Sequence, residues 1–100
     1  MKVQLEKEIV LLNGNKIPDA GGKNMTVKDA IITALTAAES DQKITGEQKF
    51  KRYNMAQKIS TMKSEGELTA EEITEIKKRI GEVYAMPEVI GFVFNTLEGN

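Results

Sequence analysis

The chain has 100 residues, a formal net charge of −1, and neither cysteine nor histidine. This length predicts a single domain over residues 1–100, with a modest core and a free energy of unfolding of about 5–15 kcal/mol. Without cysteine or histidine, the sequence excludes disulfides, thiolate nucleophiles, cysteine-ligated metals and Ser–His or Cys–His catalytic pairs. The small net charge provides no overall field that would attract nucleic acid or an anionic membrane.

The N-terminal segment is predicted to form a β-hairpin over residues 2–18. Apolar residues alternate along its first strand, residues 3–12, and share one face: Val3, Leu5, Ile9 and Leu11. Asn13-Gly14 favours a two-residue hairpin turn, because both positions of that turn need positive φ. The return strand is short, since it meets Pro18, which cannot donate a hydrogen bond to a ladder.

The two arms of this hairpin are unequal, so the first half of the first strand has no partner within the hairpin. One explanation is a frayed N-terminus or a third short strand near Met25. The other is an open edge that accepts a strand from another chain.

Three helix starts carry a threonine at the N-cap position. Thr26, Thr45 and Thr69 are each followed three residues later by an acid or amide side chain, which is the capping-box pattern. The predicted helices span residues 27–38, 46–63 and 70–85, and residues 64–67 are predicted to form a turn. In the third helix, Glu75 and Arg79 have the i, i+4 spacing of an ion pair.

A fourth helix is predicted over residues 87–98, with Pro87 in its first turn and Gly99 just after its end. Its apolar surface is wider than one contact needs, because Phe92 lies off the main apolar stripe. We therefore expect this helix to be buried centrally or shared with a second chain. Its candidate interaction surface comprises Ile90, Phe92, Val93, Phe94 and Leu97. The expected fold is α+β and mostly α, with the N-terminal β-hairpin followed by a compact bundle of about four helices over residues 26–99.

The sequence offers little that suggests catalysis or cofactor binding. Carboxylates lie at helix starts and on polar faces, where capping and solvation explain them, so we expect no enzyme activity, catalytic residues or cofactor. Oxygen ligands around residues 13–15 and 39–41 lack the spacing of a calcium loop, so no metal site is predicted. Gly21-Gly22 lacks the context of a phosphate-binding loop.

The second helix is the basic element of the chain and supplies an alternative surface. Its candidate residues are Lys49, Lys51, Arg52 and Lys58. With Phe50 and Tyr53 nearby, these side chains would contact phosphates and stack on a base. Against this, the acids that follow at residues 65–75 would neutralise part of the surface if the second and third helices pack antiparallel.

Four segments together resemble a family of small proteins encoded by bacteriophages and prophages. They are the Asn13-Gly14 hairpin, the segment 46–53 (GEQKFKRY), the segment 68–78 with its LTAEEI start, and the C-terminal segment 87–99. The resemblance covers most of the chain and contains no catalytic signature. This chain carries Met86, a poor N-cap residue, before the C-terminal Pro87.

The resemblance implies a phage protein in the cytoplasm of the bacterial host or in the virion. We expect it to act through contacts with a protein partner, as a self-associating accessory of head or tail assembly. The alternative is a small effector that binds a host protein or nucleic acid through the basic helix, residues 46–63. No membrane association is expected, because no apolar run approaches the roughly 20 residues that span a bilayer.

Overall fold

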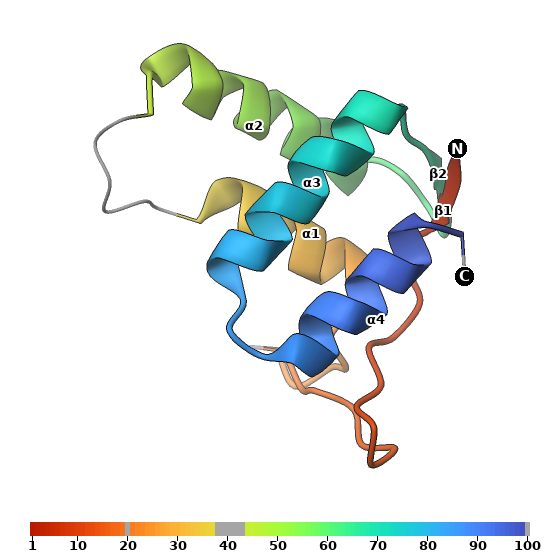
Figure 1. Cartoon of the computed structure of the whole chain (residues 1–100). Coiled ribbons are helices and arrows are strands. Elements are labelled where there is room, and N and C mark those ends of the chain that lie inside the picture. Colours follow the sequence, from red (N-terminus) through yellow and green to blue (C-terminus); the bar gives the residue numbers. More distant parts are fainter. Residues whose placement is uncertain (20, 38–43, 100) are drawn as a thin grey trace.

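The computed structural model describes residues 1–19, 21–37 and 44–99. Its elements, in chain order, are β1 (Lys2–Gln4), α1 (Val27–Thr36), α2 (Gly46–Ser60), β2 (Glu65–Glu67), α3 (Ala70–Val83) and α4 (Pro87–Leu97). The expected class, α+β and mostly α, is confirmed: within the described residues, four helices form a bundle beside a small antiparallel sheet (Figure 1).

Helix α1 lies at the centre of the bundle. It packs against α2 and α3 and also touches α4. In Figure 1 it runs behind α3, with α2 above and α4 below. Its apolar residues recur at helical spacing and are buried along its whole described length: Val27, Ala30, Ile31, Ala34 and Leu35. Small alanine side chains shorten the distance between helix axes, which suits a helix that is contacted on several sides.

Helix α4 covers one side of the bundle and is not its centre. The chain turns sharply after α3, so that α4 runs back alongside it (Figure 1). Pro87 occupies the start of α4, and Met86 makes no side-chain cap bond, as expected for a methionine at that position. The face of α4 toward the core buries Val89, Val93, Thr96 and Leu97.

All three predicted threonine capping boxes are confirmed. In each, the threonine hydroxyl accepts a bond from the backbone N–H three residues later, and the side chain there accepts one from the threonine N–H. Helix α2 nevertheless ends at Ser60 and not at residue 63. The hydroxyl of Ser60 donates to Gln57 O at 2.7 Å and that of Thr61 to Lys58 O at 2.8 Å, so side chains bind the carbonyls of the last turn.

The other helix ends differ from expectation by one or two residues. Helices α3 and α4 end at Val83 and Leu97, against predicted ends at residues 85 and 98. Helix α1 ends at Thr36, and the predicted last residue, 38, lies outside the described part of the chain.

The first strand finds its partner within the chain, at a place where the sequence predicted only a turn. β1 pairs antiparallel with β2, in the register Lys2↔Glu67, Val3↔Gly66 and Gln4↔Glu65. Neither of the two expected explanations foresaw this pairing. Glu and Gly are poor strand formers, so β2 carries no local strand signal. Its pairing follows instead from the burial of Val3, in β1, and of Leu68, directly after β2.

The chain does turn at Asn13-Gly14, but not through the predicted two-residue turn, because Gly14 N donates to Leu11 O at 2.9 Å and Asn13 does not have the expected positive φ. The predicted strand over residues 3–12 is also interrupted. Gly14 has a φ of +86°, and Leu11 N donates to Asn15 O at 2.8 Å beside a Val10↔Lys16 bridge. Before this turn the chain leaves the strand conformation at residues 5–6. A segment near Met25 does bond to the first arm, since Ile9 N donates to Met25 O at 3.0 Å, but it forms isolated bridges and not the third short strand that was one of the two explanations.

The interruption has a physical cause at the start of α1. Val27 N donates to Lys7 O at 2.9 Å, and Lys28 N donates to Leu5 O at 2.8 Å. The first N–H groups of a helix have no partner inside the helix. The N-terminal segment therefore supplies acceptors to α1, and these carbonyls are not available to a second strand.

Arg79 closes the opposite end of α1. It comes from α3, is only 2% exposed, and donates from Nε to Ala34 O at 3.1 Å and from Nη2 to Ala37 O at 3.3 Å. The last turn of α1 contains no basic residue. A guanidinium from another helix thus binds carbonyls that lack partners within α1 and meets the negative end of its dipole. From its sequence context, only a local pair with Glu75 was predicted for Arg79.

Candidate interaction surface

The predicted surface on α4 divides between the core and the molecular surface. Val93 and Leu97 are fully buried in the core, so they cannot contact a partner. Ile90, Phe92 and Phe94 are partly buried and pack against that core. The five residues are therefore not brought together on one accessible face.

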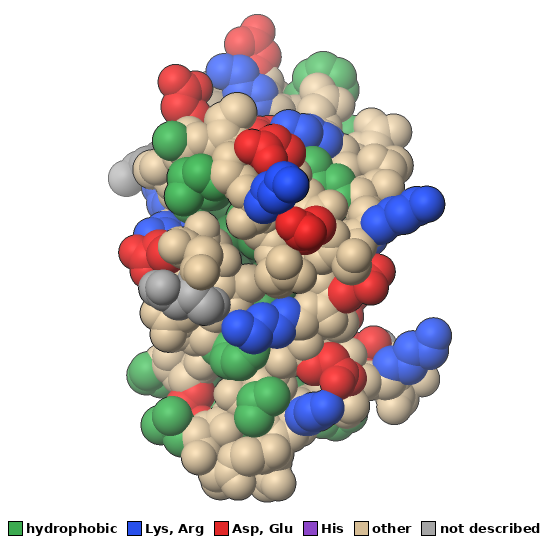
Figure 2. Space-filling model, turned by 90° about the vertical axis from the view of Figure 1, so that its right-hand side faces the viewer, with side chains coloured by type: hydrophobic (Ala, Val, Ile, Leu, Met, Phe, Trp, Pro, Cys, Tyr) green, Lys and Arg blue, Asp and Glu red, His purple; other side chains and the backbone are tan. Residues whose placement is uncertain are grey.

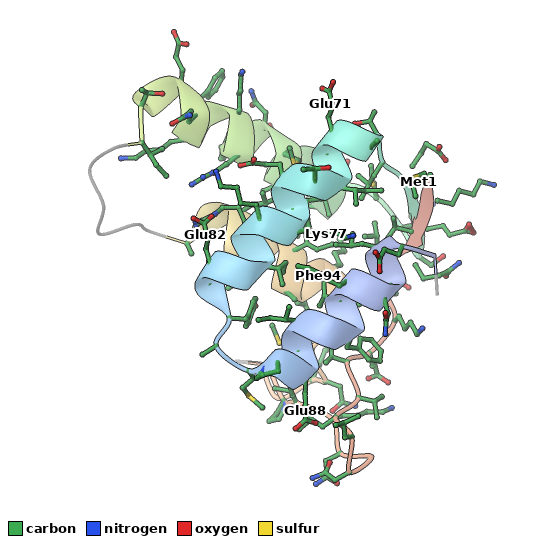
Figure 3. The ribbon with its side chains drawn as sticks, in the orientation of Figure 1. Met1, Glu71, Lys77, Glu82, Glu88 and Phe94 are labelled. Carbon is green, nitrogen blue, oxygen red and sulfur yellow. The ribbon has the colours of Figure 1, made fainter. Side chains whose placement is uncertain are left out.

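Lysine side chains cover part of the two phenylalanine rings. Lys7 Nζ lies 5.3 Å from the ring centre of Phe92, and Lys77 Nζ lies 5.4 Å from that of Phe94. Figure 3 shows Lys77 and Phe94 close together between α3 and α4. Such cation–π contacts contribute about 0.5–1 kcal/mol at exposed sites. The two lysine side chains also shield from water part of the apolar rings that would otherwise be exposed.

The most exposed apolar side chain belongs to the hairpin loop and not to α4. Leu12 is 93% exposed, and Val10 and Met86 are also exposed. Leu12 borders a hollow of about 310 Å³ between this loop and α4. We call this region the hairpin–α4 surface, and its lining residues are Val10, Leu12, Pro87, Glu88, Gly91, Phe92 and Asn95.

A hydrogen bond holds the exposed leucine against α4. Leu12 N donates to Glu88 Oε2 at 2.6 Å, and Figure 3 shows Glu88 at the start of α4, beside the hairpin loop. This bond joins residues 76 positions apart and has no local sequence signal.

Leu12 and Val10 were not predicted as surface residues, although the sequence contains a signal for them. In the predicted strand, the even-numbered positions Gln4, Glu6 and Glu8 form the polar face. Val10 and Leu12 continue that same face and are apolar. Two apolar residues at the end of a solvent-facing row indicate a local contact surface.

The alternative basic surface on α2 is only partly available. Lys49 and Lys51 are exposed, whereas Arg52 is buried, with Nε 3.4 Å from Glu75 Oε1. Lys58 Nζ lies 2.9 Å from Glu72 Oε2. The expected neutralisation by the acids of α3 is thus confirmed for Lys58, and Arg52 is drawn into the same contact between helices.

Two aromatic side chains remain exposed on α2. Phe50 is 63% exposed and Tyr53 56%. Tyr53 also lines a hollow of about 360 Å³ beside the end of α1, together with Leu35 and Lys49. Helix α2 is thus another place, besides the hairpin–α4 surface, where large apolar side chains of the described residues meet solvent.

Glu72 has a lowered pKa for identifiable reasons. Partial burial by itself would raise the pKa of its carboxyl group, but hydrogen bonds from Lys58 and from Thr69 outweigh burial and lower it. The same carboxylate completes the α3 capping box, since Thr69 N donates to Glu72 Oε1 at 2.9 Å. Glu72 therefore joins the start of α3 to α2.

Tyr84 has a raised pKa. Burial is the main cause, and the carboxylate of Asp29 adds to the rise, while Thr33 acts in the opposite direction. The hydroxyl group of Tyr84 is enclosed by protein and forms no hydrogen bond of good geometry with the described residues. It is a packing residue that carries an unsatisfied polar atom.

The described residues contain no group of three or more acidic side chains that could hold a metal ion. Nor does any described helix combine the length and the apolar character needed to cross a bilayer. Charged side chains of both signs are interspersed over the face shown in Figure 2, with several hydrophobic side chains toward its lower end.

Comparisons of the chain with protein-family models, with curated proteins and with solved structures gave no match.

Proposed function

We propose that the chain is a non-enzymatic protein that acts through protein–protein contacts at the hairpin–α4 surface. The observation that carries this proposal is the position of Leu12, which is 93% exposed yet bound through its backbone N–H to Glu88. This bond restrains the loop backbone at Leu12 while its side chain stays in solvent, so a partner would remove little loop freedom on binding.

The neighbourhood of Leu12 has the composition of a small contact site. Val10, Pro87 and Phe92 supply apolar area, and Asn95 and Glu88 supply polar groups at the edge. Burying one leucine contributes roughly 1.5–3 kcal/mol. One or two such central contacts inside a polar rim commonly supply most of the affinity of an interface.

The resemblance of segments 13–14, 46–53, 68–78 and 87–99 to small phage proteins supports a phage context for this activity. We therefore propose an accessory of head or tail assembly, self-associating, located in the host cytoplasm or in the virion. The absence of a signature for catalysis in the sequence agrees with this role.

The test is co-purification of the tagged chain with named virion components from infected bacteria. Leu12→Ser should remove that association. Phe50→Ser is the matched control, since it removes an exposed apolar side chain from α2 and should leave the association unchanged. Association that withstands Leu12→Ser but is lost with Phe50→Ser would refute the hairpin–α4 surface as the contact site.

The exposed aromatic pair on α2 favours a second candidate function. In this alternative the chain is a small effector that binds a host protein or nucleic acid through Phe50, Tyr53, Lys49 and Lys51. Arg52 and Lys58 contribute little to it, because they contact acids of α3. Reversing the charges of Lys49 and Lys51 to glutamate should abolish binding to single-stranded oligonucleotides at low salt, and binding that persists would exclude this role.

A further inference from the structure

We propose that Asn13 is a site of spontaneous covalent modification, where the side-chain amide is converted to aspartate and isoaspartate and the hairpin loop is thereby released from α4. Three observations on the described residues carry this inference: an unhindered nucleophile at Gly14, a hydrogen-bond donor on the Asn13 side-chain oxygen, and a loop that closes around residue 13. The chemistry stands without the proposed function, whereas its consequence for a partner rests on that function.

The reaction needs only the chain and water. The backbone nitrogen of Gly14 attacks Cγ of Asn13, so that a new N–C bond forms, the Gly14 N–H proton passes to water, and the side-chain nitrogen leaves as ammonia. The product is a cyclic succinimide. Water then opens this ring at either carbonyl carbon. Opening at Cγ leaves an aspartate, and opening at the main-chain carbon leaves an isoaspartate, in which the backbone runs through the former side chain.

Gly14 presents its nitrogen without a side chain in the way. Both Asn13 and Gly14 are exposed, and Figure 1 shows their loop projecting from the bundle below α4. A residue without Cβ allows the closest approach to its backbone. Asn13-Gly14 is also the one Asn-Gly pair in the sequence, because the other described asparagines precede residues that carry a side chain: Asn15-Lys16, Asn24-Met25, Asn54-Met55 and Asn95-Thr96.

A backbone donor lies where negative charge develops during the attack. Asn13 Oδ1 accepts a hydrogen bond from Asn15 N at 2.9 Å. Attack at Cγ moves charge onto this oxygen, and a donor already held at such an oxygen stabilises the transition state. One bond opposes the reaction, since Gly14 N donates to Leu11 O at 2.9 Å. Opening a single exposed turn bond slows the attack by at most about tenfold.

The products do not fit the loop as it stands. Leu11 N donates to Asn15 O at 2.8 Å, and together with the Gly14–Leu11 bond this closes the backbone around residue 13. Isoaspartate adds one carbon atom to the backbone at this position, so the two bonds cannot both keep their geometry. Both products also place a carboxylate, ionised at neutral pH, next to Leu12, whose N–H binds Glu88 Oε2 at 2.6 Å. Each change weakens the bond that holds Leu12 against α4.

The first experiment follows the purified full chain alone, aged in neutral to mildly alkaline buffer made with heavy-oxygen water. Peptide mass spectrometry with fragmentation that separates the two isomers should find aspartate and isoaspartate at residue 13, each with one heavy oxygen. Asn24 and Asn54, the matched exposed controls, should remain amides. The same chain aged in urea should react at residue 13 no more than about tenfold faster than the folded chain.

Two variants separate the contributions of the nucleophile and the donor. Gly14→Ala should slow the conversion in the folded chain and in urea alike, because its side chain hinders the attack in both states. Asn15→Pro removes the N–H that binds Asn13 Oδ1 and should slow the folded chain by about two- to tenfold without changing the rate in urea. Asn15→Ala keeps that N–H and is the matched control. Thermal melting checks that each variant folds.

The release of the loop is measured by hydrogen exchange of the Leu12 N–H in the separated fresh and aged forms. Exchange should be faster in both products and fastest in the isoaspartate form. Asn13→Asp supplies the charge alone and should raise the exchange rate by about two- to fivefold. Glu88→Gln should abolish this difference, because it removes the opposing carboxylate.

Three results would overturn the inference: a residue 13 that stays an amide for as long as Asn54, a folded chain protected far beyond tenfold, or aged forms in which Leu12 exchange is unchanged. Failure of the proposed function gives a different result. A modified chain with a released Leu12 that still co-purifies with virion components would refute the hairpin–α4 surface as the contact site and leave the modification of Asn13 standing.

Discussion

Arg79 is expected to be the most important charged residue for stability. Arg79→Met keeps a long, unbranched side chain but removes the donors that bind Ala34 O at 3.1 Å and Ala37 O at 3.3 Å. Ala34 is fully buried, so its carbonyl oxygen would lose its charged donor without access to water. Hydrogen bonds to charged groups contribute about 1.5–3 kcal/mol each, and an unsatisfied buried acceptor costs about 1–3 kcal/mol.

The removal of a buried guanidinium also recovers part of its desolvation cost, which opposes this loss. We therefore expect a net loss of about 2–4 kcal/mol in the free energy of unfolding, with the Ala34 carbonyl as the larger contribution. For a domain of this size, that corresponds to a melting temperature lower by at least roughly 8 °C. This is a large fraction of the stability of a small domain.

Urea unfolding followed by circular dichroism measures this loss. Lys78→Met is the matched control, because Lys78 is the neighbouring exposed residue of α3 and its removal should change stability by less than about 0.5 kcal/mol. Arg79→Lys should be intermediate, since one ammonium group cannot reproduce the planar fork that reaches both oxygens. If Arg79→Met lost less than about 1 kcal/mol with an unchanged m value, the proposed capping of α1 would be wrong.

Three further predictions concern packing and ionisation. Gly66→Ala should lower the free energy of unfolding by about 1–3 kcal/mol, because the added Cβ would lie 2.7 Å from Cδ1 of the fully buried Leu5. Glu72→Gln should flatten the acid limb of the stability profile. The pKa of Glu72 in the folded chain lies below the ordinary value for a glutamate of 4.5, so the Glu72–Lys58 contribution to stability is present above that pH and is lost as pH falls through the folded pKa. Tyr84→Phe should leave stability at neutral pH unchanged or raise it by up to about 1 kcal/mol, and should remove the loss expected as pH rises through a tyrosine pKa above 10.0.

Each of these three variants has a control variant in the same chain. Gly81→Ala adds a methyl group where nothing lies within 4 Å and should stabilise α3, so equal effects at positions 66 and 81 would contradict the close contact at Gly66. Glutamine still completes a capping box, as Gln48 does in α2, so Glu72→Gln isolates the ion pair from the cap. Tyr53→Phe tests an exposed phenol, and the Tyr84 interpretation fails if both variants alter the alkaline limb alike.

The helices and their starts were predictable because the interactions that define them are local. A capping box joins residues three apart, and the apolar stripe of α1 repeats with the period of the helix. Thr26, Thr45 and Thr69 therefore mark the three starts in the sequence as clearly as in the structure. The place of the hairpin turn was predictable for the same reason, since Gly14 has the positive φ expected of it, but the turn spans Leu11–Gly14 and Asn13 lacks the positive φ that was predicted.

The candidate site was only partly predictable. The sequence placed Ile90, Phe92, Val93, Phe94 and Leu97 on one broad apolar helix, but it could not say which side faces the core. Packing against α1 and α3 buries Val93 and Leu97, and two lysines cover the rings of the two phenylalanines. The accessible apolar side chain at this site is instead that of Leu12. Its backbone N–H reaches Glu88 of α4 only because the hairpin folds against that helix.

Tertiary structure alone decided the contacts between residues far apart in the chain. β1 pairs with β2 more than half the chain away, Arg79 of α3 caps α1, and Glu88 of α4 binds the N–H of Leu12. In each case a backbone N–H or C=O group has no hydrogen-bond partner nearby in the sequence. It bonds instead to whichever group of the opposite kind the fold brings close. The local sequence states that such a group needs a partner; only the packing of the four helices determines which residue supplies it.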